Sequence, residues 1–148
     1  MRILLATDGS EYSEAAVDEI ARRPLPPKTE VLVISVFELP SFPLSVPFGG
    51  VDFDNEIQKA AGIAVEKAAA KLQAREESSK VNVLTRVVSG SPKRVILEQA
   101  EAFGADLIVV GSRGLGAWDR LLLGSVSQAV AMHANCSVEI ARGKQADN

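Results

Sequence analysis

Residues 105–132, ADLIVVGSRGLGAWDRLLLGSVSQAVAM, contain the pattern around which the fold is organised. The apolar run at 105–110 predicts a short buried strand, and residues 127–132 predict a helix. Between them, three glycines and a serine have the spacing G-x2-G-x9-G-S. These residues are Gly111, Gly114, Gly124 and Ser125. The stretch therefore predicts a strand that leads through a glycine-rich connection into a helix.

A connection of this kind suits phosphate groups. Glycine lacks a Cβ, so its main chain can approach an anion closely and can adopt positive φ angles. The first turn of a helix presents N–H groups without intrahelical partners, together with the positive end of the helix dipole. We therefore expect residues 111–126 to hold the phosphates of a nucleotide.

The composition is that of an ordinary globular domain: the chain has 148 residues, of which 47% are hydrophobic and 24% charged. A net charge of −3 gives no general attraction for nucleic acids or acidic membranes. Cys136 is the only cysteine, which excludes a disulfide within the chain and a thiolate metal cluster. No apolar run approaches the roughly 20 residues that span a bilayer, and the first residues, MRILLATDGS, lack the pattern of a secretory signal. These features predict a cytoplasmic protein that binds neither nucleic acids nor membranes.

Apolar runs alternate with helical patterns along the chain. Besides the elements around the glycines, strands are predicted at 2–6, 30–37, 81–89 and 137–142, and helices at 11–23, 56–74 and 92–103. Ser91 and Pro92 predict the cap and first position of the third helix, and Gly104 its end. This alternation predicts one α/β domain over residues 1–143, with a parallel sheet covered by helices on both faces, followed by a polar tail at 144–148.

Residues 38–54 break the pattern, with three prolines and two glycines among apolar residues. A connection this long is uncommon in a compact domain and is often a lid or a binding loop. Its apolar residues, among them Phe42, Phe48 and Phe53, are equally compatible with a loop packed on the body of the protein or on a partner. The sequence leaves both interpretations open.

The expected position of a ligand follows from the sheet. In open parallel sheets, ligands bind beyond the carboxyl ends of the strands, where the strand order reverses. A strand order of 3-2-1-4-5 would put that point between the first and fourth strands. Residues 7–10, TDGS, would then face the glycine-rich connection across one crevice.

Three segments resemble the universal stress protein family: ATDGS at 6–10, GSP at 90–92, and GSRGLG…LLLGSVS between 111 and 127. The resemblance covers nearly the whole chain, and the glycine spacing is similar to the signature of the family's ATP-binding branch. It implies a flavodoxin-like sheet of order 3-2-1-4-5, a site for ATP or another adenine nucleotide, and a homodimer.

The same resemblance implies roles for individual residues. The phosphate and ribose segment is matched by Gly111, Gly114, Gly124, Ser125 and Val126. Thr7 and Asp8 match the end of the first strand near the adenosine, and Val36 matches the wall of the adenine pocket. Ser127 matches a further neighbour of the phosphates.

The last strand departs from the family pattern. Family members commonly end in an apolar strand that follows a proline and pairs across the dimer axis, whereas this chain has Ser137 in place of the proline and Glu139 within the run. Charged edge strands pair less readily with one another. The departure argues against the usual dimer through this strand, but not against the nucleotide site.

Several site residues also have a purely structural explanation. Ser125 and Gln128 fit a capping box, and Asp8 followed by Glu11 fits a cap of the first helix. The functional alternative for Asp8 is a carboxylate that accepts from a ribose hydroxyl or the adenine amine, or that contacts a Mg²⁺ bridging the phosphates. Arg113 could pair with phosphate oxygens or remain solvated.

The catalytic signals are weak. The sequence has neither a Walker loop nor a G-x-G-x-x-G motif, and its only histidine, His133, falls near the end of the last helix. No lysine lies in the glycine-rich connection to neutralise a transferring phosphate. We therefore expect binding rather than turnover. Three functions stay open: an ATP-binding regulatory protein with Mg²⁺ and a possible protein partner, a nucleotide-free interaction protein, and a slow ATPase.

Overall fold

The computed structural model describes residues 1–40, 52–76, 80–115 and 122–143. Most of the predicted long connection at 38–54 and the predicted tail at 144–148 lie outside the described residues. The structure consists of one five-stranded parallel sheet and four helices in those ranges. Its strands are β1 (Arg2–Ala6), β2 (Glu30–Phe37), β3 (Asn82–Ser89), β4 (Leu107–Gly111) and β5 (Ser137–Ala141).

The strand order is β3-β2-β1-β4-β5, which confirms the flavodoxin-like prediction. The central strands are buried on both faces, as their unbroken apolar sequences indicate. All five residues of β4 are buried, and so are Val31 to Ser35 of β2. The predicted switch point therefore lies between β1 and β4, which pair directly with each other.

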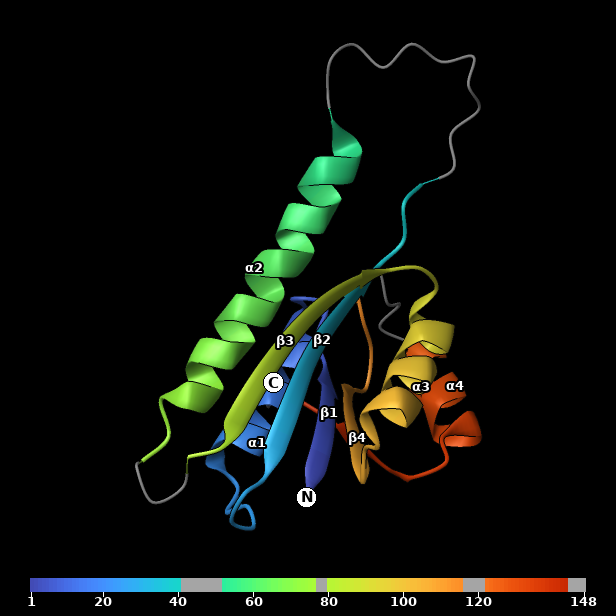
Figure 1. The fold of residues 1–148 in the computed structure, drawn as a ribbon. Helices are drawn as coiled ribbons and strands as arrows, with labels where there is room; N and C mark the ends of the chain where they lie inside the picture. The colour runs from blue at the N-terminus through green and yellow to red at the C-terminus, as the bar shows by residue number, and fades with distance from the viewer. Residues whose placement is uncertain (41–51, 77–79, 116–121, 144–148) are drawn as a thin grey trace, which may run out of the picture.

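The helices form two layers, one on each face of the sheet (Figure 1). They are α1 (Glu11–Arg22), α2 (Phe53–Gln73), α3 (Pro92–Phe103) and α4 (Ser125–His133). α1 and α2 cover one face, where Ile3, Leu5 and Val33 are buried against Ile20 and Leu72. α3 and α4 cover the other face over a second apolar cluster. The members of that cluster are Leu4, Leu32, Ile34, Val95, Ile96, Ala100, Ile108, Val110 and Val130.

Some element boundaries differ from those predicted. α2 begins at Phe53 rather than at residue 56, because the Asp52 carboxylate accepts the Asn55 N–H (3.2 Å) and caps the helix. β4 begins two residues later than predicted and includes Gly111. Ser91 occupies the cap position of α3, but its hydroxyl makes no capping hydrogen bond. Gly104 ends α3 in the left-handed conformation (φ 67°), as predicted.

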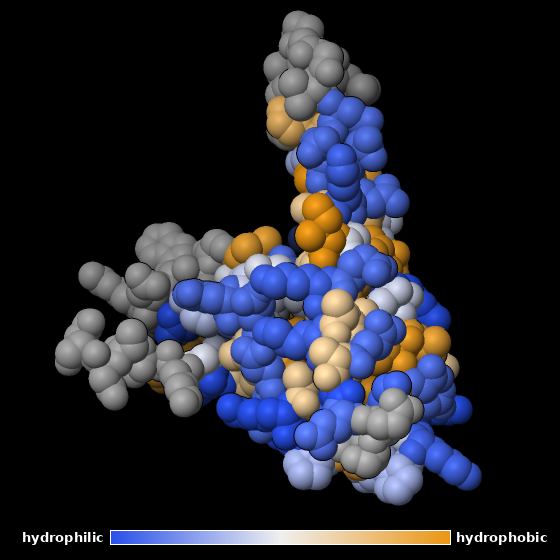
Figure 2. All heavy atoms as spheres, turned by 90° about the vertical axis from the view of Figure 1, so that its left-hand side faces the viewer, coloured by the Kyte–Doolittle hydropathy of each residue, from blue (hydrophilic) through white to orange (hydrophobic). Residues whose placement is uncertain are grey.

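α2 extends beyond the carboxyl ends of the strands, so that its first turns project from the body of the domain (Figure 1). In the face shown in Figure 2, this projecting end is largely hydrophilic, with apolar atoms gathered where the helix meets the body. Among the described helices, none is both long and apolar enough to cross a membrane. The projecting turns of α2 form one side of the site described next.

Candidate functional site

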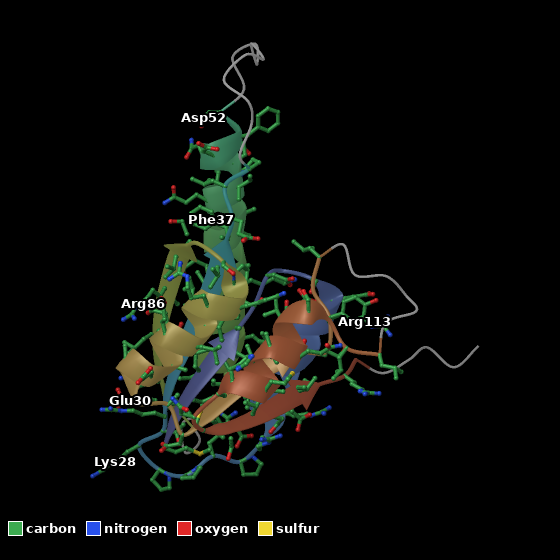
Figure 3. The ribbon with its side chains drawn as sticks, turned by 90° about the vertical axis from the view of Figure 1, so that its right-hand side faces the viewer. Lys28, Glu30, Phe37, Asp52, Arg86 and Arg113 are labelled. Carbon is green, nitrogen blue, oxygen red and sulfur yellow. The ribbon has the colours of Figure 1, made fainter. Side chains whose placement is uncertain are left out.

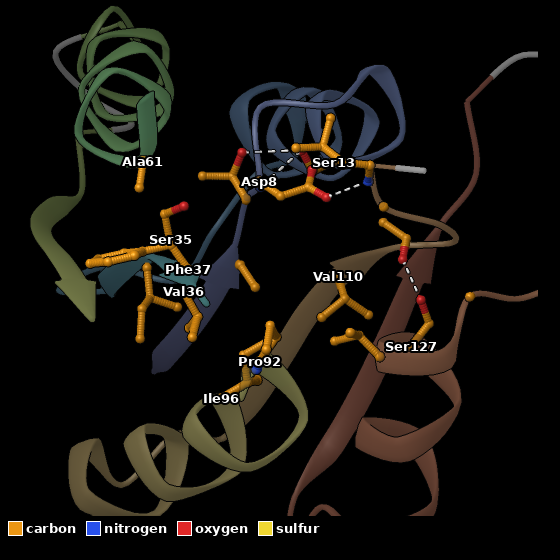
Figure 4. A pocket seen from close by; sticks show the side chains of 18 of the residues that line it. Asp8, Ser13, Ser35, Val36, Phe37, Ala61, Pro92, Ile96, Val110 and Ser127 are labelled. Carbon is orange, nitrogen blue, oxygen red and sulfur yellow. Dashed lines mark hydrogen bonds between the residues drawn. The ribbon is translucent and has the colours of Figure 1, made fainter. Parts of the chain in front are cut away.

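A cavity of about 630 Å³ opens at the carboxyl ends of β1, β2 and β4, at the switch point of the sheet. Residues from α2, from the start of α3 and from the start of α4 complete its walls (Figure 4). All ten residues predicted for the nucleotide site line this cavity. They are Thr7, Asp8, Val36, Gly111, Arg113, Gly114, Gly124, Ser125, Val126 and Ser127.

Asp8 connects the end of β1 to the glycine-rich segment. One carboxylate oxygen accepts the Ser10 N–H (2.9 Å), and the other accepts the Leu115 N–H (2.8 Å) from more than a hundred residues along the chain. The alternative in which Asp8 caps α1 is wrong: Ser10 is the cap, and its hydroxyl accepts the Ser13 N–H (3.2 Å). Asp8 therefore fixes the glycine-rich segment against the first strand while its carboxylate lines the cavity.

A buried hydroxyl cluster supports this strand end. The Thr7 and Ser13 hydroxyls lie 3.1 Å apart, and the Ser13 hydroxyl donates to the Ser10 carbonyl (3.0 Å). Gly9 has a φ of 80°, a conformation that residues with a Cβ rarely adopt, and it turns the chain from β1 into α1. Thr7 and Ser13 thus give the cavity a polar stretch of wall that is held by hydrogen bonds.

The signature glycines lie at points of close packing, against backbone atoms at Gly111 and Gly124 and against a side chain at Gly114. A Cβ on Gly111 would lie 2.5 Å from the Tyr12 carbonyl oxygen and 2.8 Å from the Ser13 nitrogen. A Cβ on Gly114 would lie 2.7 Å from an Asp8 carboxylate oxygen, and one on Gly124 only 3.2 Å from the Arg113 Cα. Each glycine thus lets two stretches of chain approach more closely than a side chain would allow.

The start of α4 leaves three main-chain donors at the cavity. Gly124 is the cap residue and its carbonyl accepts the Gln128 N–H (3.0 Å), so the N–H groups of Ser125, Val126 and Ser127 precede the first intrahelical donor. The capping-box explanation of Ser125 is wrong, because Ser125 is the first helical residue and the Gln128 side chain donates to the Leu123 carbonyl instead (3.3 Å). This end of the cavity can therefore accept an anion.

The Ser127 hydroxyl has a structural partner. It is buried and donates to the Gly111 carbonyl (2.7 Å), which joins α4 to the end of β4. The Ser125 hydroxyl, by contrast, lies on an exposed residue that lines the cavity, and it makes no hydrogen bond among the described residues. Of the two serines, Ser125 is the better placed to contact a ligand directly.

Arg113 is the only cationic side chain among the described residues that line the cavity. Its guanidinium lies over the Tyr12 ring, 5.5 Å from the ring centre, so it is not simply solvated. Two acidic residues, Asp8 and Glu38, also line the cavity. Arg113 alone would not balance the charge of a triphosphate beside these carboxylates. A bound cation or the positive end of the helix dipole at the start of α4 would have to contribute as well.

The opposite end of the cavity is mostly apolar, and Val36 is the only residue there that the sequence predicted. Ser35 and Phe37 of β2 line this end with α2 residues and with the first turn of α3 (Figure 4). Figure 3 shows Phe37 beside α2, at the end of β2 away from Glu30 and well apart from Arg113. The α2 and α3 residues are Ile57, Ala60, Ala61, Pro92 and Ile96. The sequence contains one indication of a polar group at this end: Ser35 is the only residue with a hydroxyl in the strand EVLVISVF.

A second hollow, of about 360 Å³, lies between the C-terminal ends of α3 and α4. His133 and Cys136 line it, and neither lines the first cavity. Burial raises the pKa of the Cys136 thiol, with a smaller contribution from the Asp106 carboxylate. His133, at the end of the last helix, therefore lies away from the first cavity.

The family follows from a comparison over almost the whole chain: the model of the universal stress protein family matches residues 1–142. The chain belongs to the universal stress protein family. A universal stress protein of Thermus aquaticus, named for the QAH/OAS sulfhydrylase 3′ region, is 33% identical over 141 residues, which are 95% of this chain and 97% of that protein.

Solved structures share this fold. Hypothetical protein MJ0577, whose biochemical function was assigned from its structure, has a TM-score of 0.75 and 26% identity over 98% of this chain and 97% of its own. A universal stress protein in complex with cAMP has a TM-score of 0.61 and 26% identity over 96% of each chain. At least one similar member of the family therefore binds an adenine nucleotide.

Proposed function

We propose that this protein is a cytoplasmic, ATP-binding regulatory member of the universal stress response, and that residues 1–143 act as its single nucleotide-binding domain. The observation that supports this proposal is the cavity at the switch point, which brings all ten predicted residues together. The similar structure solved with cAMP supports an adenine nucleotide as the ligand class.

The chemistry of the cavity walls suggests the orientation of the ligand. The phosphates would lie against the glycines and the free N–H groups of Ser125, Val126 and Ser127. The ribose would lie near Thr7 and Asp8, which line the cavity at the end of β1. The base would occupy the apolar end.

A Mg²⁺ ion fits the charges at this site. The described cavity residues contribute two carboxylates, of Asp8 and Glu38, and one guanidinium, of Arg113. ATP would therefore add negative charge to a site whose carboxylates already outnumber its guanidinium. Mg²⁺ prefers oxygen ligands and usually keeps several waters while it bridges phosphates. The Asp8 carboxylate, which lines the polar part of the cavity, would contact such an ion directly or through water.

Thermal unfolding with and without MgATP tests the proposal. A ligand at about 100 times its dissociation constant that binds only the folded protein adds roughly 2.7 kcal/mol to the free energy of unfolding. We expect the wild-type melting temperature to rise by several degrees. Ser125→Trp, which places an indole at the cavity, should abolish the rise, whereas Gln128→Trp, an exposed position on the same helix outside the cavity, should preserve it.

The same experiment separates the alternatives. A wild-type protein that shows no shift at millimolar MgATP would favour the nucleotide-free interaction protein over the ATP-binding one. A shift accompanied by ADP release, faster in the wild type than in Ser125→Trp, would favour the slow ATPase.

We also propose a homodimer through β5. This strand lies at the edge of the sheet, and the Glu139 carboxylate is engaged within its own chain, where it accepts two hydrogen bonds from the Arg23 guanidinium (2.7 and 2.6 Å). Glu139, and then Glu19, raise the pKa of Arg23. The charge that argues against pairing is thereby balanced. Light scattering should give twice the 15.7 kDa of one chain, and a mass of one chain would contradict the dimer.

A further inference from the structure

The two halves of α2 differ in what holds them. Among residues 53–60, all of which the structure describes, none is buried, whereas half of residues 61–72 are. The buried residues are Ala61, Ala64, Val65, Ala68, Ala69 and Leu72. The exposed turns are those that project beyond the strands in Figure 1. Residues 53–60 are therefore called the projecting half of α2, and residues 63–73 the anchored half.

The anchored half is fixed to α1 as well as to the sheet. The Lys67 ammonium pairs with the Glu14 carboxylate, and one turn later the Lys71 ammonium pairs with the Asp18 carboxylate. Just past the helix, the Arg75 guanidinium donates to three main-chain carbonyls at the end of α1. Exposed ion pairs are individually weak, but these contacts add to the burial of the same half in the core. The anchored half therefore belongs to the rigid body of the domain.

Gly62 lies where the two halves meet. Glycine within a helix is destabilising relative to alanine, because it loses more conformational freedom on folding. At Gly62 no close contact requires it, since a Cβ there would meet no atom within 4 Å, and its φ angle is not positive. What the glycine adds at this position is backbone freedom, which is the property of a hinge.

The projecting half forms the outer part of one cavity wall. Ile57 and Ala60 line the cavity from this half, and Pro92 lines it from the start of α3. In Figure 4, Ala61 lies on α2 at one side of the cavity and Pro92 on α3 at another. Because α2 and α3 cover opposite faces of the sheet, a bend of the projecting half toward α3 would narrow the opening between them.

The inward stripe of α2 becomes polar in the projecting half. Residues three or four positions apart share one face of a helix. Counting back from Val65 and Ala61, which are buried, the same face carries Gln58 and Asp54, which are exposed. Where the helix passes the ends of the strands, its inner face thus suits a polar ligand rather than the apolar core.

We propose that the projecting half of α2 is a hinged lid, which bends at Gly62 toward α3 and closes over a nucleotide bound in the cavity. This inference rests on the proposed function and adds a conformational change to it. A ligand drives such a change only if it binds the closed form more tightly. Contacts of the ligand with the inner face of the projecting half, made on closure, would supply that difference. The anchored half stays on α1 throughout.

Electron paramagnetic resonance of the full chain, with spin labels on Asn55→Cys and Lys93→Cys, tests the lid. Both residues are exposed and lie outside the cavity lining. Cys136→Ala removes the native thiol, which lines the second hollow instead. A kink of about 20° at Gly62 would move residue 55, which lies about 10 Å along the helix, by about 4 Å. We expect MgATP to shorten the distance between the labels by about that amount.

Gly62→Ala, made in the labelled protein, removes the backbone freedom and should reduce the shortening by at least half. Ala70→Gly is the matched control, because it changes helix propensity by a similar amount at an exposed position in the anchored half. It should leave the shortening as in the protein without this change.

Binding is followed in the same samples by the thermal shift with MgATP. If MgATP raises the melting temperature but leaves the label distance unchanged, the inference is wrong and the proposed function stands. The same conclusion holds if Gly62→Ala shortens the distance fully, or if Ala70→Gly reduces the shortening as much as Gly62→Ala does. If MgATP gives no thermal shift, the proposed function fails and the lid fails with it.

Discussion

The two ends of the cavity are built by different means. At the glycine end, main chain packs against main chain: Gly111 lies against Tyr12 and Ser13, and Gly124 against Arg113. At the apolar end, side chains from separate elements form the walls, with Ser35 and Phe37 on β2 and Ala61 on α2. The first arrangement permits only glycine at certain positions, whereas the second could be formed by many combinations of residues.

This difference indicates how each end should respond to substitution. Backbone packing has no side chain that can move away, so small additions at the glycine end should disturb the fold itself. Side-chain walls can be altered with the fold intact, so changes at the apolar end should affect ligand binding selectively.

The largest effect is expected for Gly111→Ala. Its Cβ would lie 2.5 Å from the Tyr12 carbonyl oxygen and 2.6 Å from the Tyr12 carbonyl carbon, so β4 or α1 must shift. We expect a loss of about 3 kcal/mol in the free energy of unfolding, measured by urea denaturation. Gly62→Ala is the control, because a Cβ there meets no atom within 4 Å, and it should gain up to about 1 kcal/mol. Equal stability of the two variants would contradict the tight packing.

Gly114→Ala should act mainly on binding. The nearest atom to its Cβ would be an Asp8 carboxylate oxygen at 2.7 Å, at the end of a side chain that can rotate. That rotation would break the hydrogen bond from the Leu115 N–H. We expect about tenfold weaker MgATP binding with a loss of stability below about 1 kcal/mol. If Gly114→Ala lost as much free energy of unfolding as Gly111→Ala, this part of the glycine end would be as rigid as the rest.

A pair of serines compares the two ends directly. Ser127→Ala removes a hydroxyl that donates to the Gly111 carbonyl and should cost about 1 kcal/mol of stability. Ser35→Ala removes a hydroxyl that makes no hydrogen bond to a described residue, and it should leave the ligand-free stability within about 0.5 kcal/mol. Thermal unfolding of both variants without nucleotide gives the comparison. A larger loss for Ser35→Ala would show that its hydroxyl already has a structural role.

The smallest effect is expected for Tyr12→Leu. The ring lies under the guanidinium of Arg113, which lines the cavity, and this interaction contributes about 0.5–1 kcal/mol. MgATP binding should weaken about two- to fivefold, and Tyr12→Phe should restore it. A variant that binds MgATP as tightly as the wild type would indicate that Arg113 needs no support from the ring.

The same contrast explains what the sequence could reveal. The strand order and the glycine end were predictable, because apolar runs such as those of β2 and β4 indicate buried strands and because glycine spacing reflects backbone contacts. The helix caps were less so. Ser10 caps α1 in place of Asp8, and Gly124 caps α4 in place of Ser125. In both places adjacent residues are of types that commonly cap helices, so the sequence alone does not choose between them. The backbone angles of the folded chain make the choice.

The apolar end was the least predictable part. It depends on how α2 lies across the end of β2, and no local pattern relates Phe37 to Ala61 across the connection between them. Ser35 gave a weak signal, as a hydroxyl in an otherwise apolar strand. Only the three-dimensional arrangement shows that Ser35 lines a cavity.

The central claim is that one nucleotide spans both ends of this cavity, and amide NMR of the full chain titrated with MgATP tests it most directly. The account predicts saturable shifts in two groups of N–H signals, at 111–115 with 125–127 and at 35–37, with little change around His133 and Cys136 in the second hollow. Shifts confined to that second hollow, or no saturable shift at millimolar MgATP, would contradict the account.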